Sequence, residues 1–341
     1  TYIFAAGNRA MVKMSENSIH LSRLLIKLVP DYFPPEKLSF FEETGTVGIQ
    51  FSQLPFDHLL FTGSGATGKA VMASAAKNLT PVTLELGGKS PAVIAPDYPM
   101  QKAVERIMFA KIFNAGQVCV NVDYLFVSED RIEDFVAAAK SWVAKHCPDI
   151  NSPDYTSIID QRSFDRLTDA LEDARRLGAK IINLAEGQNS EPELRKMTPQ
   201  LVLNTNDDMI LMQREIFGPI LPVLPYKDQQ QVRDYINQRD RPLAFYPFTK
   251  DRELQKYYLD HVMSGGACVN DALIHPGQHD LPFGGVGASG MGHYHGYEGF
   301  ATFSKLRPVF YQAGFSSLKF LAPPYGKFAD KMLNIILKRK L

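Results

Sequence analysis

The chain has 341 residues, which is long enough for about two domains. Its 37 basic side chains balance 37 acidic ones, so bulk charge favours neither nucleic acid nor an anionic membrane as a partner. Three cysteines lie far apart without metal-ligand spacing, and no run of about 18 apolar residues or signal peptide is present. We therefore expect a cytoplasmic protein with free thiols, no metal site and no membrane span.

The first part of the chain alternates short apolar strands with amphipathic helices. A strand is expected at residues 10–14 and a helix at 18–29, followed by a second strand at 58–61. The segment 62–65, Thr-Gly-Ser-Gly, then leads into a helix at 66–77. Glycines and hydroxyls at a helix start leave backbone N–H groups free for an anion, usually phosphate, although an ordinary capped turn has the same pattern.

Glu85 is the only charged residue of an expected strand from Val82 to Leu86. A carboxylate in an apolar strand is costly to bury unless it has partners or a chemical role. If it is desolvated, its pKa rises, which suits a general base. The alternative is a glutamate at the sheet edge that faces solvent.

Cys119 lies in the stretch from Gly116 to Val120, between an expected helix at 101–115 and an expected strand at 123–127. A loop between two rigid elements suits a nucleophile. The alternative is a small core residue, because free cysteine is among the most buried residue types.

The rest of the chain continues the alternation of strands and helices. Helices are expected at 131–145, 162–177, around 232–236 and at 252–262, and strands at 91–95, 180–183, 220–226, 243–249 and 266–270. This order predicts a parallel-type α/β architecture. The glycine-dense segment 282–292 cannot be a regular helix or strand, and its aromatic neighbours favour a packed loop near a site.

The tail from 328 to 341 has apolar residues at helical spacing between lysines and an arginine. It is expected to dock on a partner subunit, and the alternative is that it lies on a membrane surface.

Six stretches occur in the order in which NAD(P)-dependent aldehyde dehydrogenases have them, between residues 12 and about 300. They are Val12-Lys13-Met14-Ser15-Glu16, Phe61-Thr62-Gly63-Ser64, Leu84-Glu85-Leu86-Gly87-Gly88-Lys89-Ser90-Pro91, Gly116-Gln117-Val118-Cys119, Glu215-Ile216-Phe217-Gly218-Pro219 and the glycine loop at 282–292. The chain therefore resembles that family. Asp123-Tyr124, where other branches carry an arginine, makes it similar to the class 3 branch, with the coniferyl aldehyde dehydrogenase group as the nearest match.

The resemblance implies an α/β fold with a Rossmann-type cofactor domain, an α/β catalytic domain and a C-terminal oligomerisation arm. Residues 1–86 would be the remaining part of the dinucleotide-binding domain, and 87–286 would be the cysteine-bearing domain. Residues 287–341 would return to the cofactor domain and end in the arm. A homodimer is the family expectation.

The resemblance also implies the roles of two residues. Cys119 would attack the aldehyde carbon to give a thiohemiacetal, and hydride transfer to the nicotinamide would leave a thioester. Glu85, which lies 34 residues earlier as in the family, would activate the water that hydrolyses this thioester. An unperturbed thiol is mostly protonated at neutral pH, so the site must lower its pKa or deprotonate it on demand.

Four residues would bind the adenine half of the cofactor. Lys13 and Glu16 would hold the adenine-side ribose, and Gly63 and Ser64 would bind the pyrophosphate at a helix start. A glutamate beside the ribose favours NAD because it would repel a 2′-phosphate, but class 3 members can use NADP and both cofactors stay open.

Two further residues would bind the nicotinamide half. Glu215 would accept the hydroxyls of the nicotinamide ribose, and Phe217 would lie beside the ring. The alternative for Glu215 is a loop carboxylate in solvent.

One family feature is absent from these residues. The family shares its oxyanion hole between the cysteine N–H and the amide of an asparagine in a Pro-Trp-Asn motif, just upstream of a segment like Thr1–Gly7. Because that segment resembles the middle of a helix, we expect the chain to lack an N-terminal portion. Losing one oxyanion donor costs about 10²–10³ in rate, so a polypeptide limited to these residues is expected to be inactive or poorly folded.

Two other functions remain open on the sequence. An acylating dehydrogenase would pass the thioester to coenzyme A, but it typically needs no general base, so Glu85 argues against it. A non-catalytic binding or structural protein of the same fold is disfavoured by the presence of Cys119, Glu85 and Glu215 together. The sequence does not identify the aldehyde, for which aromatic or cinnamyl types and medium- to long-chain aliphatic types are the candidates.

Overall fold

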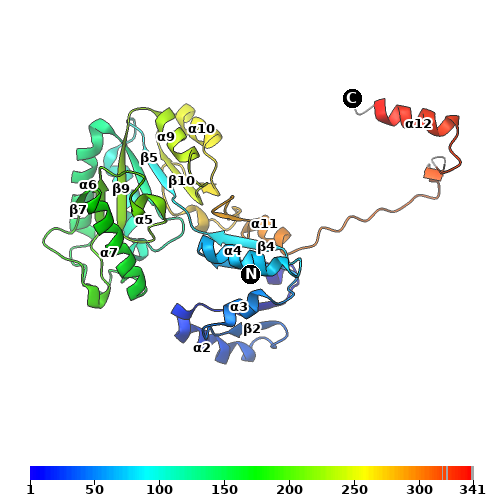
Figure 1. Cartoon of the computed structure of the whole chain (residues 1–341), viewed down its shortest axis with the longest axis horizontal. Coiled ribbons are helices and arrows are strands. Elements are labelled where there is room, and N and C mark those ends of the chain that lie inside the picture. The colour runs from blue at the N-terminus through cyan, green and yellow to red at the C-terminus, as the bar shows by residue number, and fades with distance from the viewer. Residues whose placement is uncertain (317, 320–321, 339–341) are drawn as a thin grey trace. The chain divides into compact units, whose positions relative to one another are not determined.

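The computed structural model describes residues 1–316, 318–319 and 322–338 (Figure 1). Residue contacts form two compact units, 1–304 and 305–341. No helix among the described residues is long and apolar enough to cross a membrane.

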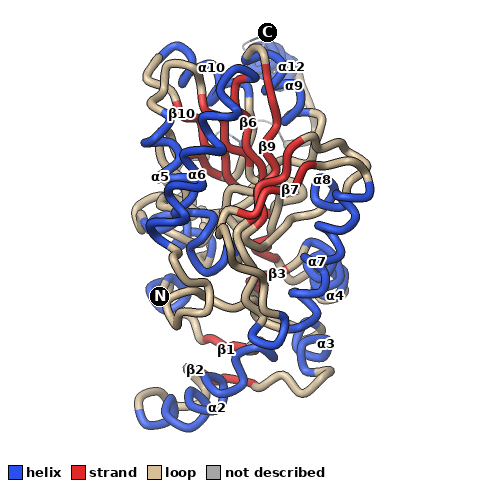
Figure 2. Tube along the Cα trace, turned by 90° about the vertical axis from the view of Figure 1, so that its left-hand side faces the viewer, coloured by secondary structure: helices blue, strands red, loops and turns tan. Residues whose placement is uncertain are grey.

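A seven-stranded sheet forms the centre of the first unit (Figure 2). Its strands, in spatial order, are β11 (Gly266–Ala267), β10 (Ala244–Phe248), β5 (Pro91–Ile94), β6 (Tyr124–Ser128), β9 (Ile220–Tyr226), β8 (Gln200–Leu203) and β7 (Lys180–Asn183). All neighbouring pairs are parallel except β7 with β8. The predicted α/β architecture is therefore confirmed, with one antiparallel strand at the edge.

Helices cover both faces of this sheet because successive strand residues point to opposite sides. Leu125 and Val127 of β6 pack in one core cluster with α5 (Met100–Ile112) and α6 (Ile132–His146). Tyr124 and Phe126 of the same strand pack in a second cluster on the other face. The helices of that second face are α7 (Gln161–Arg176), α9 (Gln229–Asn237) and α10 (Arg252–His261).

Aspartates fix where three of these helices begin. Asp160, Asp228 and Asp251 precede α7, α9 and α10, and each carboxylate accepts a backbone N–H bond from the first turn of its helix. An N-cap of this kind stabilises a helix by about 1 kcal/mol.

Two smaller sheets lie in the same unit. A parallel pair is formed by β1 (Ala10–Lys13) and β2 (Leu38–Phe41), joined through α2 (Ile19–Leu28). The second sheet has β3 (Leu59–Gly63) parallel to β4 (Val82–Leu86), with α4 (Gly65–Ala76) between them in the chain. On its other side β4 pairs antiparallel with β12 (Gly290–Met291).

The strand β12 corrects the prediction that segment 282–292 holds no regular element. Gly290 has a φ of +139°, and a Cβ atom there would lie 2.0 Å from the carbonyl oxygen of Leu84. The missing side chain lets two backbones approach closely enough to pair.

Two predicted elements are shorter than expected. The helix expected at 101–115 ends at Ile112, because Asn114 and Ala115 adopt positive φ angles. The strand expected at 266–270 ends at Ala267, ahead of Asn270 with a φ of 63°.

Several short elements were not predicted, since their patterns are too brief to show a period. Besides β2 and β8, they are the α-helices α3 (Val47–Ser52), α8 (Ile210–Gln213) and α11 (Gly296–Thr302) and the 3-10 helices η1 (Glu16–Ser18), η2 (Val29–Asp31), η3 (Phe113–Gly116), η4 (Glu129–Arg131), η5 (Pro192–Leu194) and η6 (His275–Gly277). The helix α1 (Tyr2–Ala5) lies in the segment Thr1–Gly7, which was expected to be helical.

The second unit contains α12 (Lys327–Lys338), which confirms the helix expected in the tail. Residues 339–341 of that prediction lie outside the described residues.

Candidate active site

The loop that carries Cys119 starts in an uncommon backbone conformation. After α5, the φ angles of Asn114, Ala115 and Gly116 are 52°, 50° and 73°. Three consecutive positive angles turn the chain sharply, and non-glycine residues adopt them only where the surroundings hold them.

Side-chain amides hold this loop from within. Gln117 donates to the carbonyl of Asn114 at 3.0 Å, and its amide oxygen accepts the N–H of Ile159 at 2.8 Å. Asn121 donates to the carbonyl of Gly116 at 2.7 Å. These bonds satisfy backbone groups that the irregular loop would otherwise leave unpaired.

The Cys119 side chain is partly buried and packs against the core of the large sheet. Burial, followed by the carboxylates of Glu215 and Glu85, raises the pKa of the Cys119 thiol to about 11. The resting thiol is therefore neutral at pH 7. Of the two possibilities left by the sequence, this arrangement favours a thiol that is deprotonated on demand.

Glu85 lies in the middle strand of the three-stranded sheet, paired with Thr62 on β3 and with Gly290 on β12. Its side chain is only 4% exposed, so it is not the solvent-facing edge residue of the alternative reading. Among the described residues, neither carboxylate oxygen has a hydrogen-bond partner. Burial raises the pKa of Glu85 to about 8, which is suitable for a general base near neutral pH.

Glu215 lies against the glycine pair that follows β4. A Cβ atom on Gly87 would be 1.9 Å from one of its carboxylate oxygens, so a larger residue there would displace the Glu215 carboxylate. Burial and the nearby Asp123 raise the pKa of Glu215 to about 8, whereas the Gly88 N–H and Lys89 act in the opposite direction. The Glu215 side chain is partly buried, which argues against the solvent-exposed alternative.

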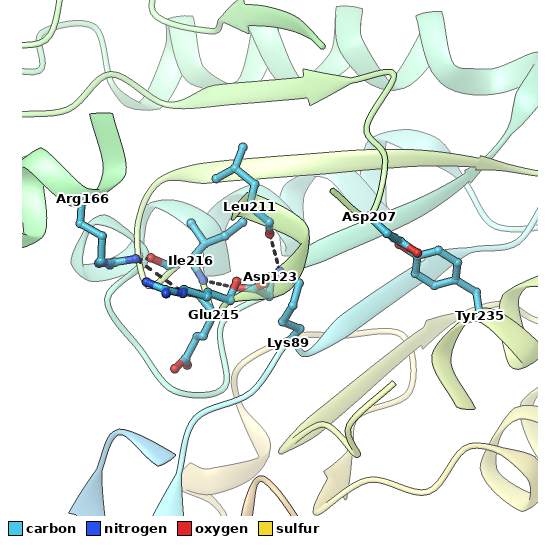
Figure 3. A network of polar contacts seen from close by, with 9 residues as sticks. Lys89, Asp123, Arg166, Asp207, Leu211, Glu215, Ile216 and Tyr235 are labelled. Atoms are coloured by element: carbon cyan, nitrogen blue, oxygen red, sulfur yellow. Dashed lines mark hydrogen bonds and ion pairs between the residues drawn. The ribbon is translucent and has the colours of Figure 1, made fainter. Parts of the chain in front are cut away.

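A buried ion pair joins the segments that carry these residues (Figure 3). The ammonium of Lys89 contacts the Asp123 carboxylate and donates to the carbonyls of Leu211 at 2.6 Å and Arg214 at 3.1 Å. The other oxygen of Asp123 accepts the N–H of Ile216 at 2.8 Å. These bonds therefore link three segments of the chain: the residues that follow β4, the end of the cysteine loop and the segment that contains Glu215.

Two basic residues near this ion pair were missed by the sequence reasoning. Arg166, on α7, donates to the carbonyl of Ile216 at 2.9 Å. Lys111, on α5, is fully buried, and burial lowers the pKa of its ammonium to about 7. The only sequence signal for Lys111 was a lysine on a helix with many apolar residues.

The residues predicted for the adenine half lie on other elements. Lys13 ends β1 and forms an ion pair of 2.6 Å with Glu43, while Glu16 is exposed at the start of η1. Gly63 ends β3, and the Ser64 hydroxyl accepts the Thr67 N–H at 3.2 Å as the N-cap of α4.

Phe217 belongs to a turn that contacts the cysteine loop. Its φ is 50° and its side chain is 37% exposed. A Cβ atom on Gly116 would lie 2.4 Å from the carbonyl oxygen of the next residue, Gly218. The two loops therefore touch backbone to backbone at a glycine.

The sequence profile of the aldehyde dehydrogenase family matches residues 1–309. This chain belongs to the aldehyde dehydrogenase family. It is an enzyme that oxidises an aldehyde to the carboxylic acid with NAD(P), and the predicted fold is that of the family.

Individual members of the aldehyde dehydrogenase family agree with this assignment. The chain is 50% identical to "Probable coniferyl aldehyde dehydrogenase" of Pseudomonas aeruginosa, over 99% of this chain and 71% of that protein. It is 40% identical to "Aldehyde dehydrogenase family 3 member A2" of Rattus norvegicus, over 89% of this chain and 62% of that protein, as expected for the class 3 branch. The substrate-bound structure of Staphylococcus aureus AldH superposes with a TM-score of 0.86 at 35% identity, over 98% of this chain and 72% of that one.

The backbone contact at Gly116 leads to a first prediction for this aldehyde dehydrogenase. The variant Gly116→Ala should lose about 1–3 kcal/mol in the free energy of unfolding beyond the strain of a positive φ, because its Cβ displaces the Gly218 turn. Its rate of NADH formation should fall about 100-fold, since both loops move.

Gly187→Ala is the matched control, because Gly187 has a similar φ of +76° but no atom within 4 Å of an added Cβ. It should lose about 1 kcal/mol and keep its activity. Urea unfolding and steady-state rates measure both variants; equal losses in the two would contradict the close approach.

Proposed function

We propose that Cys119 is the nucleophile of this dehydrogenase and that Glu85 is its general base. The observation that carries the proposal is a buried carboxylate without a hydrogen-bond partner among the described residues, close enough to raise the pKa of the thiol. A base in that state is free to accept a proton from the thiol or from a water molecule.

In the first step, the ionised form of Glu85 takes the proton of the Cys119 thiol as the sulfur attacks the aldehyde carbon. The backbone N–H groups of Cys119 and Val120 both lower the pKa of this thiol, so they stabilise the thiolate as it forms. The carbon–sulfur bond forms and the carbonyl π electrons move to oxygen, which gives the thiohemiacetal. Bound NAD(P) supplies the acceptor for the hydride, and a thioester on Cys119 remains.

Glu85 first releases the thiol proton to solvent and so returns to its ionised form. In the second step, it removes a proton from water while the water oxygen adds to the thioester carbon. The carbon–sulfur bond then breaks, the acid leaves and the thiolate of Cys119 is restored. The ionised form of Glu85 accumulates as the pH rises through about 8, so this step should accelerate over that range.

The residues of the chain fit the proposed nicotinamide half of the cofactor. The Glu215 carboxylate accepts hydrogen bonds only, which matches the hydroxyls of a ribose. The Gly88 N–H, Lys89 and Arg166 oppose the rise that burial causes in the pKa of Glu215, and so they favour the accepting form. Phe217 would lie beside the nicotinamide ring, from a turn in contact with the cysteine loop.

The adenine half would be bound by Lys13, Glu16, Gly63 and Ser64. The negative charge of Glu16 supports NAD over NADP, because a 2′-phosphate would be repelled. The ion pair between Lys13 and Glu43 holds the ammonium at the end of β1, where a ribose hydroxyl could join it.

An aromatic or cinnamyl aldehyde, such as coniferyl aldehyde, is the proposed substrate. Phe109 on α5 and Phe113 at the start of η3 lie ten and six residues before Cys119, and their rings are 5.7 Å apart. They are 49% and 53% exposed, whereas seven of the 13 residues of α5 are buried. An exposed ring pair next to a nucleophile supports a flat, apolar substrate, as does the name of the Pseudomonas aeruginosa relative.

We also propose that the enzyme is a cytoplasmic homodimer with the domain limits 1–86, 87–286 and 287–341. The three unpaired cysteines support a reducing compartment. Exposed apolar side chains of the second unit, among them Phe310, Tyr311 and Leu318, support an arm that binds a second subunit.

Replacement of Glu85 tests the hydrolytic route against transfer to coenzyme A. The variant Glu85→Gln should release no more than one NADH per subunit in a burst that is slower than in the wild type, because the thiol has lost its base. It should then turn over at least about 100-fold more slowly, because the thioester is no longer hydrolysed. Stopped-flow absorbance at 340 nm resolves both phases. Unchanged turnover, or turnover that requires coenzyme A in the wild type, would remove the hydrolytic assignment.

Replacement of the ring pair tests the substrate class. The double variant Phe109→Leu, Phe113→Leu should raise KM for cinnamaldehyde about tenfold, because two aromatic contacts of about 0.5–1.5 kcal/mol each are lost. The KM for hexanal should change less than about threefold.

Phe33→Leu is the matched control for this test, since Phe33 is also exposed and stacks on another ring, that of Phe4, at 5.7 Å. It should leave both KM values unchanged. An equal rise for cinnamaldehyde and hexanal in the double variant would contradict an aromatic pocket.

A further inference from the structure

Cys119 lies in a tight turn whose last peptide unit is held at both ends. The N–H of Asn121 donates to the carbonyl of Val118 at 2.9 Å, which closes the turn around Cys119 and Val120. The carbonyl of the same peptide unit, that of Val120, accepts a hydrogen bond from the phenol of Tyr246. The plane of the peptide between Val120 and Asn121 is therefore fixed by two bonds.

Tyr246 is itself rigidly placed. It lies on β10, between β5 and β11, and its side chain is completely buried. The ring of His275 packs against it with centroids 5.9 Å apart. The N–H of Leu273, a residue with a φ of 72°, also interacts with its phenol oxygen.

The cysteine loop needs such a support. Its two non-glycine residues with positive φ, Asn114 and Ala115, cost about 1–3 kcal/mol each and persist only where neighbouring groups hold them. The internal bonds of Gln117 and Asn121 act on residues 114–117, before the nucleophile. After Cys119 in the chain, the turn receives a side-chain hydrogen bond from Tyr246, at the Val120 carbonyl.

We propose that Tyr246 is a positioning residue for the reaction: its phenol fixes the Val120 carbonyl and thereby the direction of the Cys119 thiol and of the N–H groups beside it. The inference rests on the proposed role of Cys119 as the nucleophile. Without the phenol, the buried carbonyl loses its partner and the turn is free to rotate, so the sulfur reaches the attacking geometry less often.

The variant Tyr246→Phe removes only the hydroxyl, and Tyr226→Phe provides a matched control. Tyr226 lies on β9 of the same sheet, is buried, and donates to the Ile94 carbonyl at 2.8 Å, away from the cysteine loop. Both variants lose one buried phenol–carbonyl bond, so both should lower the melting temperature to a similar extent. Only Tyr246→Phe removes a bond to the turn.

The full natural chain of each variant is compared by three measurements. They are the rate at which iodoacetamide alkylates Cys119, followed by peptide mapping, the rate of the NADH burst, and KM for NAD. Tyr246→Phe should slow alkylation and the burst about 10- to 100-fold and leave KM for NAD within about twofold. Tyr226→Phe should leave all three unchanged.

Equal alkylation and burst rates in the two variants would overturn the inference. If Tyr246→Phe does not fold, p-aminophenylalanine at position 246 keeps an N–H donor in place and should retain at least about half of the wild-type burst rate; a burst rate below one tenth would contradict the role of the donor. The variant Cys119→Ala distinguishes a failure of the proposed nucleophile from a failure of the proposed role of Tyr246. Acid production by Cys119→Ala would reject Cys119 as the nucleophile. If Cys119→Ala is inactive but Tyr246→Phe and Tyr226→Phe have equal alkylation and burst rates, only the role of Tyr246 is rejected.

Discussion

The buried ion pair of Asp123 and Lys89 is the interaction on which the arrangement of the site depends. The side chains are 4% and 13% exposed, so both charges have lost most of their water. Such a pair contributes little net stability unless its remaining polar atoms are bonded. Here the Leu211 and Arg214 carbonyls and the Ile216 N–H complete it. We infer that the main effect of this ion pair is to fix the relative positions of the segments that it joins, and that it adds little to the free energy of unfolding.

The ion pair brings together three stretches that are distant in the chain. Lys89 follows the strand of Glu85, Asp123 follows the cysteine loop, and Ile216 follows Glu215. Glycines then allow the final approach, since Gly87 receives the Glu215 carboxylate and Gly116 receives the backbone of Gly218. The carboxyl groups of Glu85 and Glu215 and the thiol of Cys119 are largely desolvated. Burial therefore raises the pKa of each of these groups.

Much of this could be predicted from the sequence, because the signals were local. Glu85 stood out as the one charge of an apolar strand, and Cys119 lay in a loop between two elements. The strand limits at 82–86, 180–183 and 220–226 were also correct. What the sequence could not predict were partners far apart in the chain, such as Lys89 with Asp123 and Tyr246 with Val120, since periodicity carries no information on tertiary contacts.

Exposure was the other feature that the sequence could not settle. In the segment expected as a helix at 101–115, Phe109 and Phe113 are open to solvent, which the sequence pattern did not show. The direction of the pKa shift of Cys119 was also undecided, because it depends on how deeply the loop is buried and on two carboxylates from other segments. Both features bear directly on the chemistry.

The most direct test of the central claim is mass spectrometry of the natural enzyme quenched in acid during turnover with NAD and cinnamaldehyde. The claim predicts a cinnamoyl adduct on the peptide that contains Cys119, bound as a thioester that hydroxylamine removes. NADH formation with no such adduct, or with an adduct on Cys147 or Cys268 instead, would contradict it.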